Sequence, residues 1–194
     1  QIIDVSGLYV APGFIDPHVH MREPGFTESE TIKTGSLAAA KGGYTKVFLM
    51  PNTKPVISSV EAYQNLLEKI KQDSIIECYP LVAITKDELG QELTNFEEYD
   101  AVGFSDDGKP VTNSYLMYQA MLKAKELNKP IVVVLSAGSA IELPFADDVN
   151  AIVNGCLGGQ AGALAMVKVL KGEVNPSGKL SESYPIEYKD TLSS

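Results

Sequence analysis

Positive charge is scarce in this chain of 194 residues. Its 16 Lys and Arg stand against 25 Asp and Glu, which gives a net charge of -9. Because proteins bind phosphate backbones through clustered Lys and Arg, this balance argues against a nucleic-acid partner. Long apolar runs are also missing, since no stretch approaches the ~20 residues that a membrane span needs. We therefore expect neither nucleic acid nor a membrane as a partner.

Cysteine is almost as scarce, with only Cys78 and Cys156 in the chain. Both lie in apolar segments, so we predict reduced, buried thiols and no disulfide, as in a cytoplasmic protein. The sequence also lacks an initiating Met and a signal peptide. We expect a piece trimmed from a longer cytoplasmic chain.

Histidine occurs only twice, as His18 and His20, shortly after the apolar run from Leu8 to Ile15. We predict that this run is a buried strand ending in the turn at Pro24-Gly25. Residues i and i+2 of a strand point to the same face, so both imidazoles would face one way. Zinc accepts imidazole nitrogen, and this spacing suits a chelate. The alternative is a pair of histidines that only make hydrogen bonds near a loop.

The next part of the chain alternates between β-branched runs and helical patterns. Ser58-Ser59 precedes a helix, with Glu61 placed for a capping box. Alternating strands and helices predict a parallel sheet built from βα units. The predicted strands are 44–50, 75–84 and 101–105, the predicted helices are 27–40, 58–71 and 113–127, and a helical turn is predicted at 94–99.

Polar residues follow three of these strands. They are the two histidines, Asn52, and the pair Asp106-Asp107. In a βα barrel the loops after the strands share one face, where active sites are built. Each cluster has a simpler explanation, because Asn52 lies between two prolines and Asp-Asp-Gly is common in turns. Their convergence on one face favours a shared site.

Four motifs resemble the dihydroorotases of the amidohydrolase superfamily, over about residues 4–129. The motifs are the runs from His18 to Gly25, Thr34 to Thr45, Met50 to Pro55, and Phe104 to Gly108. The resemblance implies the first half of a βα barrel. It also implies a zinc-dependent hydrolase of cyclic amides.

The same resemblance implies roles for single residues. His18 and His20 would be zinc ligands, and Asp107 would be the carboxylate that reaches the metal. Arg22 and Asn52 would hold the substrate carboxylate, in keeping with the donor fork of Arg and the amide donor of Asn. A surface ion pair is the alternative for Arg22.

The resemblance is incomplete beyond residue 129. A dihydroorotase has further histidines on its fifth and sixth strands and an aspartate on its eighth, whereas the fifth strand predicted here, at 130–138, has no histidine. A four-histidine site cannot form within one copy of a chain with two histidines. Residues 130–192 instead resemble the C-terminal α/β sandwich domain of family 3 glycoside hydrolases, on the runs 132–140, 149–153, 158–165 and 170–180. That segment would add scaffold and no pair of catalytic carboxylates.

We therefore predict an α/β fold in one compact domain, residues 1–194. A half TIM barrel (1–129) would be continued by a flavodoxin-like or Rossmann-like fragment (130–194) with strands at 131–135 and 149–155 and a helix at 160–171. An open sheet edge would allow a homodimer.

The predicted function is that of an engineered chimeric scaffold without native catalytic activity. It would keep an incomplete zinc site from a dihydroorotase: His18, His20 and Asp107. The alternative is a zinc-dependent cyclic amide hydrolase acting on dihydroorotate or N-carbamoyl-aspartate. A small-molecule substrate is expected only in that second case.

Overall fold

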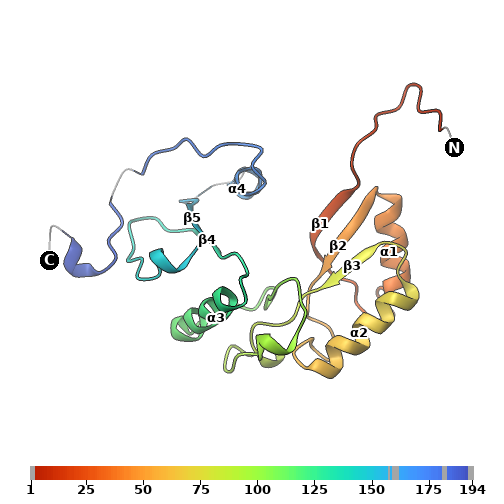
Figure 1. Cartoon of the computed structure of the whole chain (residues 1–194), viewed down its shortest axis with the longest axis horizontal. Coiled ribbons are helices and arrows are strands. Elements are labelled where there is room, and N and C mark those ends of the chain that lie inside the picture. Colours follow the sequence, from red (N-terminus) through yellow and green to blue (C-terminus); the bar gives the residue numbers. More distant parts are fainter. Residues whose placement is uncertain (1–2, 157, 159–161, 181–182, 192–194) are drawn as a thin grey trace. The chain divides into compact units, whose positions relative to one another are not determined.

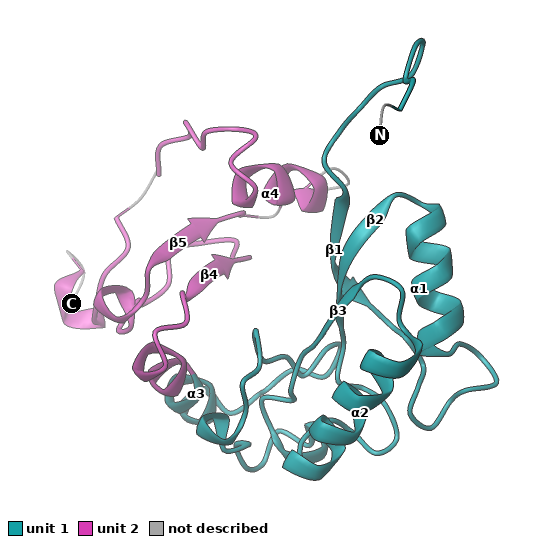
Figure 2. Ribbon diagram, turned by 45° about the vertical axis from the view of Figure 1, so that its right-hand side comes forward, with its two compact units in different colours: residues 1–120 teal, residues 121–194 magenta. Residues whose placement is uncertain are grey.

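The computed structural model describes residues 3–156, 158, 162–180 and 183–191. The chain divides into two compact units, residues 1–120 and 121–194 (Figure 2). The boundary lies inside helix α3 (Ser114–Glu126), before the predicted junction at 129/130. We describe each unit by itself, and a single folding domain stays a prediction.

Unit 1 contains a parallel sheet in the order β1-β2-β3, shown in Figure 1. Its strands are β1 (Phe14–Val19), β2 (Tyr44–Leu49) and β3 (Glu77–Pro80), the last shorter than the predicted 75–84. The fourth predicted strand is present only as an isolated parallel bridge between Val82 and Phe104. The N–H of Ser105 donates to the Val82 carbonyl at 2.9 Å, which continues the sheet by one step.

Two helices cover one side of this sheet (Figure 1). Helix α1 (Ile32–Lys41) contacts β2, helix α2 (Val60–Asp73) contacts β3, and the helices contact each other. Full burial of each large apolar side chain here contributes about 1.5–3 kcal/mol. The most deeply buried members of this core include Ile32, Val47, Leu49, Ile57, Tyr63, Leu66 and Val82.

The prediction of a buried strand from Leu8 to Ile15 is wrong. Leu8, Tyr9 and Val10 are exposed, and the strand begins only at Phe14. The reason is that the pairing partner of Phe14 is Tyr44, the first residue of β2, so β2 offers no earlier residue for pairing. The strand runs through Val19, so it includes His18 and ends just before His20.

Two helix starts also differ from the prediction. Helix α1 is capped by Thr31, so it begins later than residue 27. Helix α2 is capped by Ser59, whose hydroxyl accepts the Ala62 N–H at 3.2 Å. With Ser59 as the cap, the third helical residue is Ala62, so the predicted capping box with Glu61 is wrong.

Unit 2 contains strands β4 (Val132–Leu135) and β5 (Ala151–Asn154), which pair in parallel, and helix α4 (Gly162–Leu170). These confirm the predicted strands and helix to within about two residues, although 160 and 161 lie outside the described residues. The Asn154 amide donates to the Tyr184 hydroxyl at 2.6 Å, so residue 184 of the predicted tail lies against the end of β5.

Short 3₁₀ helices complete the described elements. The one at Phe96–Glu98 confirms the predicted helical turn at 94–99. The others are Lys86–Glu88, Ala146–Asp148 and Tyr188–Asp190. No helix within the described residues combines the length and hydropathy needed to cross a membrane.

Both cysteines are free, as predicted. Cys78 is buried in β3, but Cys156 is exposed, so the prediction of burial is wrong for that residue. Cys156 lies two residues after the end of β5, outside the strand, with φ of 47°. An apolar sequence neighbourhood therefore did not bring its side chain into a core.

Candidate metal centre

The carboxyl ends of the strands in unit 1 lie next to one another. The N–H of Met50 donates to the Val19 carbonyl at 2.9 Å, and the N–H of Leu81 donates to the Leu49 carbonyl at 2.9 Å. These bonds link the residue after each strand to the end of its neighbour. The loops that follow therefore leave the same edge of the sheet, as expected for βα units.

Three predicted ligands meet at this edge. Asp107 Oδ1 lies 3.1 Å from His18 Nε2 and 3.8 Å from His20 Nε2. One ligand atom from each of the three residues lies within 4.8 Å of the other two. Among the residues that the structure describes, this is the group of three whose composition and spacing could hold a metal ion.

These separations can be compared with those of a zinc site. Zinc bonds of about 2.0–2.1 Å place tetrahedral ligand atoms about 3.3 Å apart. The two measured separations, 3.1 and 3.8 Å, lie on either side of this value. Two imidazoles and a carboxylate are also a donor set that zinc accepts, with one position left open. The residues present fit the ion.

Asn52 connects two of the three ligands. His20 Nδ1 lies 3.0 Å from Asn52 Oδ1, and Asn52 Nδ2 donates to Asp107 Oδ2 at 2.6 Å. Since the amide oxygen can only accept, Nδ1 of His20 must be the protonated nitrogen. In the neutral imidazole this leaves the lone pair on Nε2, the nitrogen that lies 3.8 Å from Asp107 Oδ1. Asn52 therefore sets the tautomer of His20 and the orientation of the Asp107 carboxylate.

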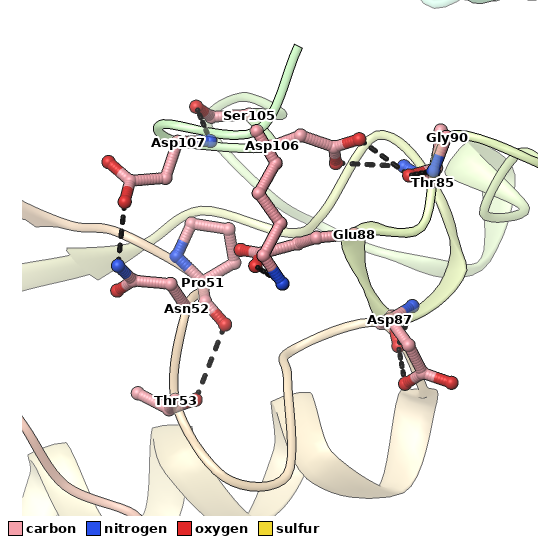
Figure 3. Close-up of polar contacts among 12 residues, drawn as sticks. Pro51, Asn52, Thr53, Thr85, Asp87, Glu88, Gly90, Ser105, Asp106 and Asp107 are labelled. Carbon is pink, nitrogen blue, oxygen red and sulfur yellow. Dashed lines mark hydrogen bonds and ion pairs between the residues drawn. The ribbon is translucent and has the colours of Figure 1, made fainter. Parts of the chain in front are cut away.

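Asp107 and its neighbour Asp106 point in opposite directions, as Figure 3 shows. Asp107 has a left-handed backbone with φ of 50°, and its N–H donates to Ser105 Oγ at 3.0 Å. The Asp106 carboxylate is buried and accepts two hydrogen bonds from Thr85. In the Asp-Asp-Gly turn, the Asp107 carboxylate therefore lies near the two histidines, whereas the Asp106 carboxylate is buried and bonded to Thr85.

Arg22, the other predicted substrate-binding residue, is half-buried in the loop after His20. Its carbonyl accepts the Phe26 N–H at 2.8 Å, within a turn. The binding of a substrate carboxylate by Arg22 and Asn52 stays a prediction.

Glu23 is a site-supporting residue that the sequence analysis missed. Its Oε2 accepts the N–H of Ile32, the first residue of α1, at 2.9 Å. Its Oε1 lies 3.5 Å from Lys69 Nζ on α2. Glu23 therefore ties the loop that contains Arg22 to both helices. Its position inside the motif from His18 to Gly25 was the available signal.

Glu88 is a second residue that the sequence analysis missed. It is buried, and its Oε2 forms an ion pair with Lys109 Nζ at 3.2 Å. Burial raises the pKa of the Glu88 carboxyl, while Lys109 acts in the opposite direction. Nothing in the local sequence distinguishes it from the exposed acidic residues nearby.

Comparisons with known proteins identify the family of this chain. The sequence model of a family described as Dihydro-orotase-like matches residues 7–139. The chain belongs to this family. A dihydroorotase of Fusobacterium nucleatum is 49% identical over 143 residues, covering 73% of this chain and 34% of the relative. A dihydroorotase of Bacillus subtilis is 42% identical over 166 residues, covering 80% of this chain and 39% of the relative. The chain thus spans about a third of the length of these relatives.

A solved structure supports the fold. The L-hydantoinase (dihydropyrimidinase) from Arthrobacter aurescens matches with a TM-score of 0.55 and 21% identity, over 71% of this chain and 32% of that chain. At this identity the match speaks for the fold alone. It establishes an α/β fold with parallel sheets like a fragment of that protein.

The glycoside hydrolase resemblance of residues 130–192 is not supported. No match above is to a glycoside hydrolase, and the family match continues past the predicted junction to residue 139. What is established is dihydroorotase-like sequence over most of the chain.

Proposed function

We propose that unit 1 is the metal-binding part of a zinc-dependent cyclic amide hydrolase of the dihydroorotase type. The observation that supports this most is the meeting of His18, His20 and Asp107, with one ligand atom of each within 4.8 Å of the others. Membership of the dihydroorotase-like family adds weight, because all three residues lie inside the match at 7–139.

The roles of the chain's own residues follow from their contacts. His18, His20 and Asp107 would hold zinc, which when bound supplies a Lewis acid and lowers the pKa of water. Asn52 keeps His20 in the tautomer that can bind a metal. Arg22 would offer paired N–H donors to the carboxylate of dihydroorotate or N-carbamoyl-aspartate.

A second candidate is an engineered chimeric scaffold without catalytic activity. The observation that favours it is the histidine count, because the two histidines of the chain are both in the cluster. A centre with more imidazole ligands would need them from elsewhere. Binding of zinc without turnover is the expected behaviour of such a scaffold.

The deciding experiment is elemental analysis of zinc in the purified full chain and in the double variant His18→Ala/His20→Ala. We expect about one zinc per chain, as three ligands imply, and loss of zinc from the double variant. Asp107→Asn should also weaken binding, whereas Asp4→Asn changes an exposed carboxylate of the N-terminal segment and should not. A chain that holds no zinc would refute the proposed site.

Activity then separates the two candidates. Hydrolysis of dihydroorotate above the level of His18→Ala/His20→Ala would support the hydrolase. Stoichiometric zinc without measurable hydrolysis would support the scaffold.

A homodimer through an open sheet edge is part of the same proposal. Strand β1 is an edge of the three-stranded sheet, and its residues Phe14 and Ile15 are exposed. Exposed apolar edges favour pairing with another strand. Light scattering of the full chain tests this, since a monomer mass at high concentration would refute it.

A further inference from the structure

Asp106 is an internal anchor beside the candidate metal centre. Its Oδ1 accepts the Thr85 N–H at 2.9 Å, and its Oδ2 accepts the Thr85 hydroxyl at 2.5 Å (Figure 3). Thr85 is completely buried, and its hydroxyl oxygen also accepts the Gly90 N–H at 2.9 Å. Hydrogen bonds to an ionised carboxylate are among the stronger ones in proteins. The hydrogen bonds between Asp106 and Thr85 therefore hold the loop after residue 104 against the segment 85–90.

An ion pair joins the same two segments at a second place. Lys109 Nζ lies 3.2 Å from Glu88 Oε2, and the Glu88 side chain is only 1% exposed. The Lys109 N–H also donates to the Asp106 carbonyl at 2.9 Å, which closes the turn. The Asp106–Thr85 hydrogen bonds and the Lys109–Glu88 ion pair therefore hold the chain on either side of Asp107.

Asp107 itself has a backbone that needs such support. A left-handed conformation in a residue other than glycine costs about 1–3 kcal/mol and persists where the surrounding structure holds it. Asp107 has φ of 50°, and this conformation accompanies a side chain directed to the two histidines. If the turn were free to relax, the carboxylate would no longer be held near the imidazoles.

We propose that Thr85, Asp106 and Glu88 are positioning residues for the metal centre. They hold the turn 105–109 so that the Asp107 carboxylate faces His18 and His20. Thr85 bonds Asp106 and Gly90, and Glu88 pairs with Lys109, whose N–H donates to the Asp106 carbonyl. All three residues therefore act through the backbone of the turn. This inference rests on the proposed zinc site and adds the residues that preorganise it.

The experiment compares three threonine variants of the full chain. Thr85→Val keeps the side-chain shape but removes the hydroxyl that bonds Asp106 and Gly90. Thr85→Ser keeps that hydroxyl. Thr94→Val is the matched control, because Thr94 is similarly buried and its hydroxyl has no hydrogen-bond partner among the described residues. Zn²⁺ affinity is measured by competition with a chelator, and Co²⁺ absorption reports the ligand field.

We expect Thr85→Val to weaken Zn²⁺ binding about tenfold to a hundredfold, the usual effect of removing support from a metal ligand. Its Co²⁺ spectrum should change, because the Asp107 ligand is displaced. Thr85→Ser and Thr94→Val should stay within about twofold of the wild type, since both keep the bonds to Asp106. Amide hydrogen exchange of the metal-free chain should show faster exchange at Asp107 and Lys109 in Thr85→Val alone.

The outcomes separate this inference from the proposed function. Wild-type binding with an unchanged Thr85→Val variant would overturn the inference and leave the zinc site standing. A wild-type chain without Zn²⁺ affinity would overturn both. If Thr85→Val does not fold by circular dichroism, Asp106→Asn replaces it, because this change turns one acceptor oxygen into a donor. A folded Asp106→Asn variant with wild-type affinity and Co²⁺ spectrum would likewise overturn the inference.

Discussion

The two units use similar sequence patterns but differ in how deeply they bury them. Val47 in β2 is 1% exposed, whereas Val134 in β4 is 45% exposed. Leu66 in α2 is 3% exposed, whereas Leu164 in α4 is 62% exposed. Both units pair apolar strands in parallel and follow them with a helix. These residues of the same local pattern are therefore buried in unit 1 and exposed in unit 2.

The difference shows that an apolar strand or helix is buried only where other strands and helices pack against it. In unit 1, two helices contact two neighbouring strands and each other. In the described part of unit 2, α4 is the one α-helix that lies wholly within the unit, and the sheet has two strands. A two-stranded sheet alone is only marginally stable in water. We therefore expect unit 1 to hold most of the stability, and the metal centre with it.

The largest effect should come from truncating the core of unit 1. Ile57→Ala removes a fully buried side chain and should lower the free energy of unfolding by about 2–5 kcal/mol. Leu164→Ala removes a comparable side chain from the exposed surface of α4 and should change it by less than about 0.5 kcal/mol. Urea unfolding followed by far-ultraviolet circular dichroism measures both, since the chain has no Trp. Equal losses in the two variants would contradict the contrast between the units.

Each unit has one cysteine, so thiol reactivity compares them directly. Cys78 is buried in unit 1, and burial raises the pKa of its thiol, while Cys156 in unit 2 is exposed. Because the thiolate is the reactive form, an aromatic disulfide reagent should modify Cys156 first. We expect Cys78 to react roughly a hundredfold more slowly, through local opening of the native state.

The variant Cys156→Ser assigns the two phases of this reaction. It should remove the fast phase and leave the slow one. Both thiols should react at the fast rate in urea above the unfolding midpoint. Fast modification of Cys78 in the native Cys156→Ser variant would show that unit 1 opens readily and would contradict the protection expected from burial.

Much of the element pattern was predictable because it depends on neighbouring residues. The runs at 44–50 and 131–135 have the β-branched composition of strands, and both are strands. The run at Leu8 has a similar composition but is exposed, because β2 begins too late to pair with it. Pairing of distant segments decided that case, and a single sequence does not show which segments pair.

Part of the candidate site was likewise predictable from the sequence, and part of it was not. The spacing of His18 and His20 predicted a pair of ligands, and the resemblance to dihydroorotases added Asp107. The structure brings the three residues together. The bonds of Asn52 to both His20 and Asp107 were not predictable, since they join three separate loops. Thr85 was missed for a related reason, because only tertiary packing places a buried threonine against Asp106.

A smaller effect should come from the helix cap in unit 1. Ser59→Ala removes the hydroxyl that accepts the Ala62 N–H and should cost about 1 kcal/mol. Ser58→Ala is the adjacent control, because the Ser58 hydroxyl lies outside the cap and bonds the exposed Asp87. Urea midpoints measure both changes. A larger loss at Ser58 would assign the cap to that residue and restore the capping box with Glu61.

The smallest effect should come from Glu88 and depends on pH. Burial raises the pKa of the Glu88 carboxyl, so between its unfolded and folded pKa values the folded chain binds more protons than the unfolded chain. The contribution of Glu88 to stability therefore falls as the pH rises through this window. Glu88→Gln keeps the size of the side chain and does not titrate. Relative to the wild type, the variant should gain stability by about 1 kcal/mol or less between pH 4 and pH 7.

The ion pair with Lys109 opposes this gain, because the neutral amide introduced by Glu88→Gln would bond the Lys109 ammonium less strongly than the carboxylate does. Lys109→Met isolates that contribution, since it removes the ammonium and leaves Glu88 buried without its partner. The pKa of Glu88 should then rise further, and the pH dependence should become steeper than in the wild type. A difference between Glu88→Gln and wild type that stays constant with pH would mean that Glu88 titrates as an exposed carboxyl. The buried ion pair of Glu88 with Lys109 would then not hold the turn that contains Asp107.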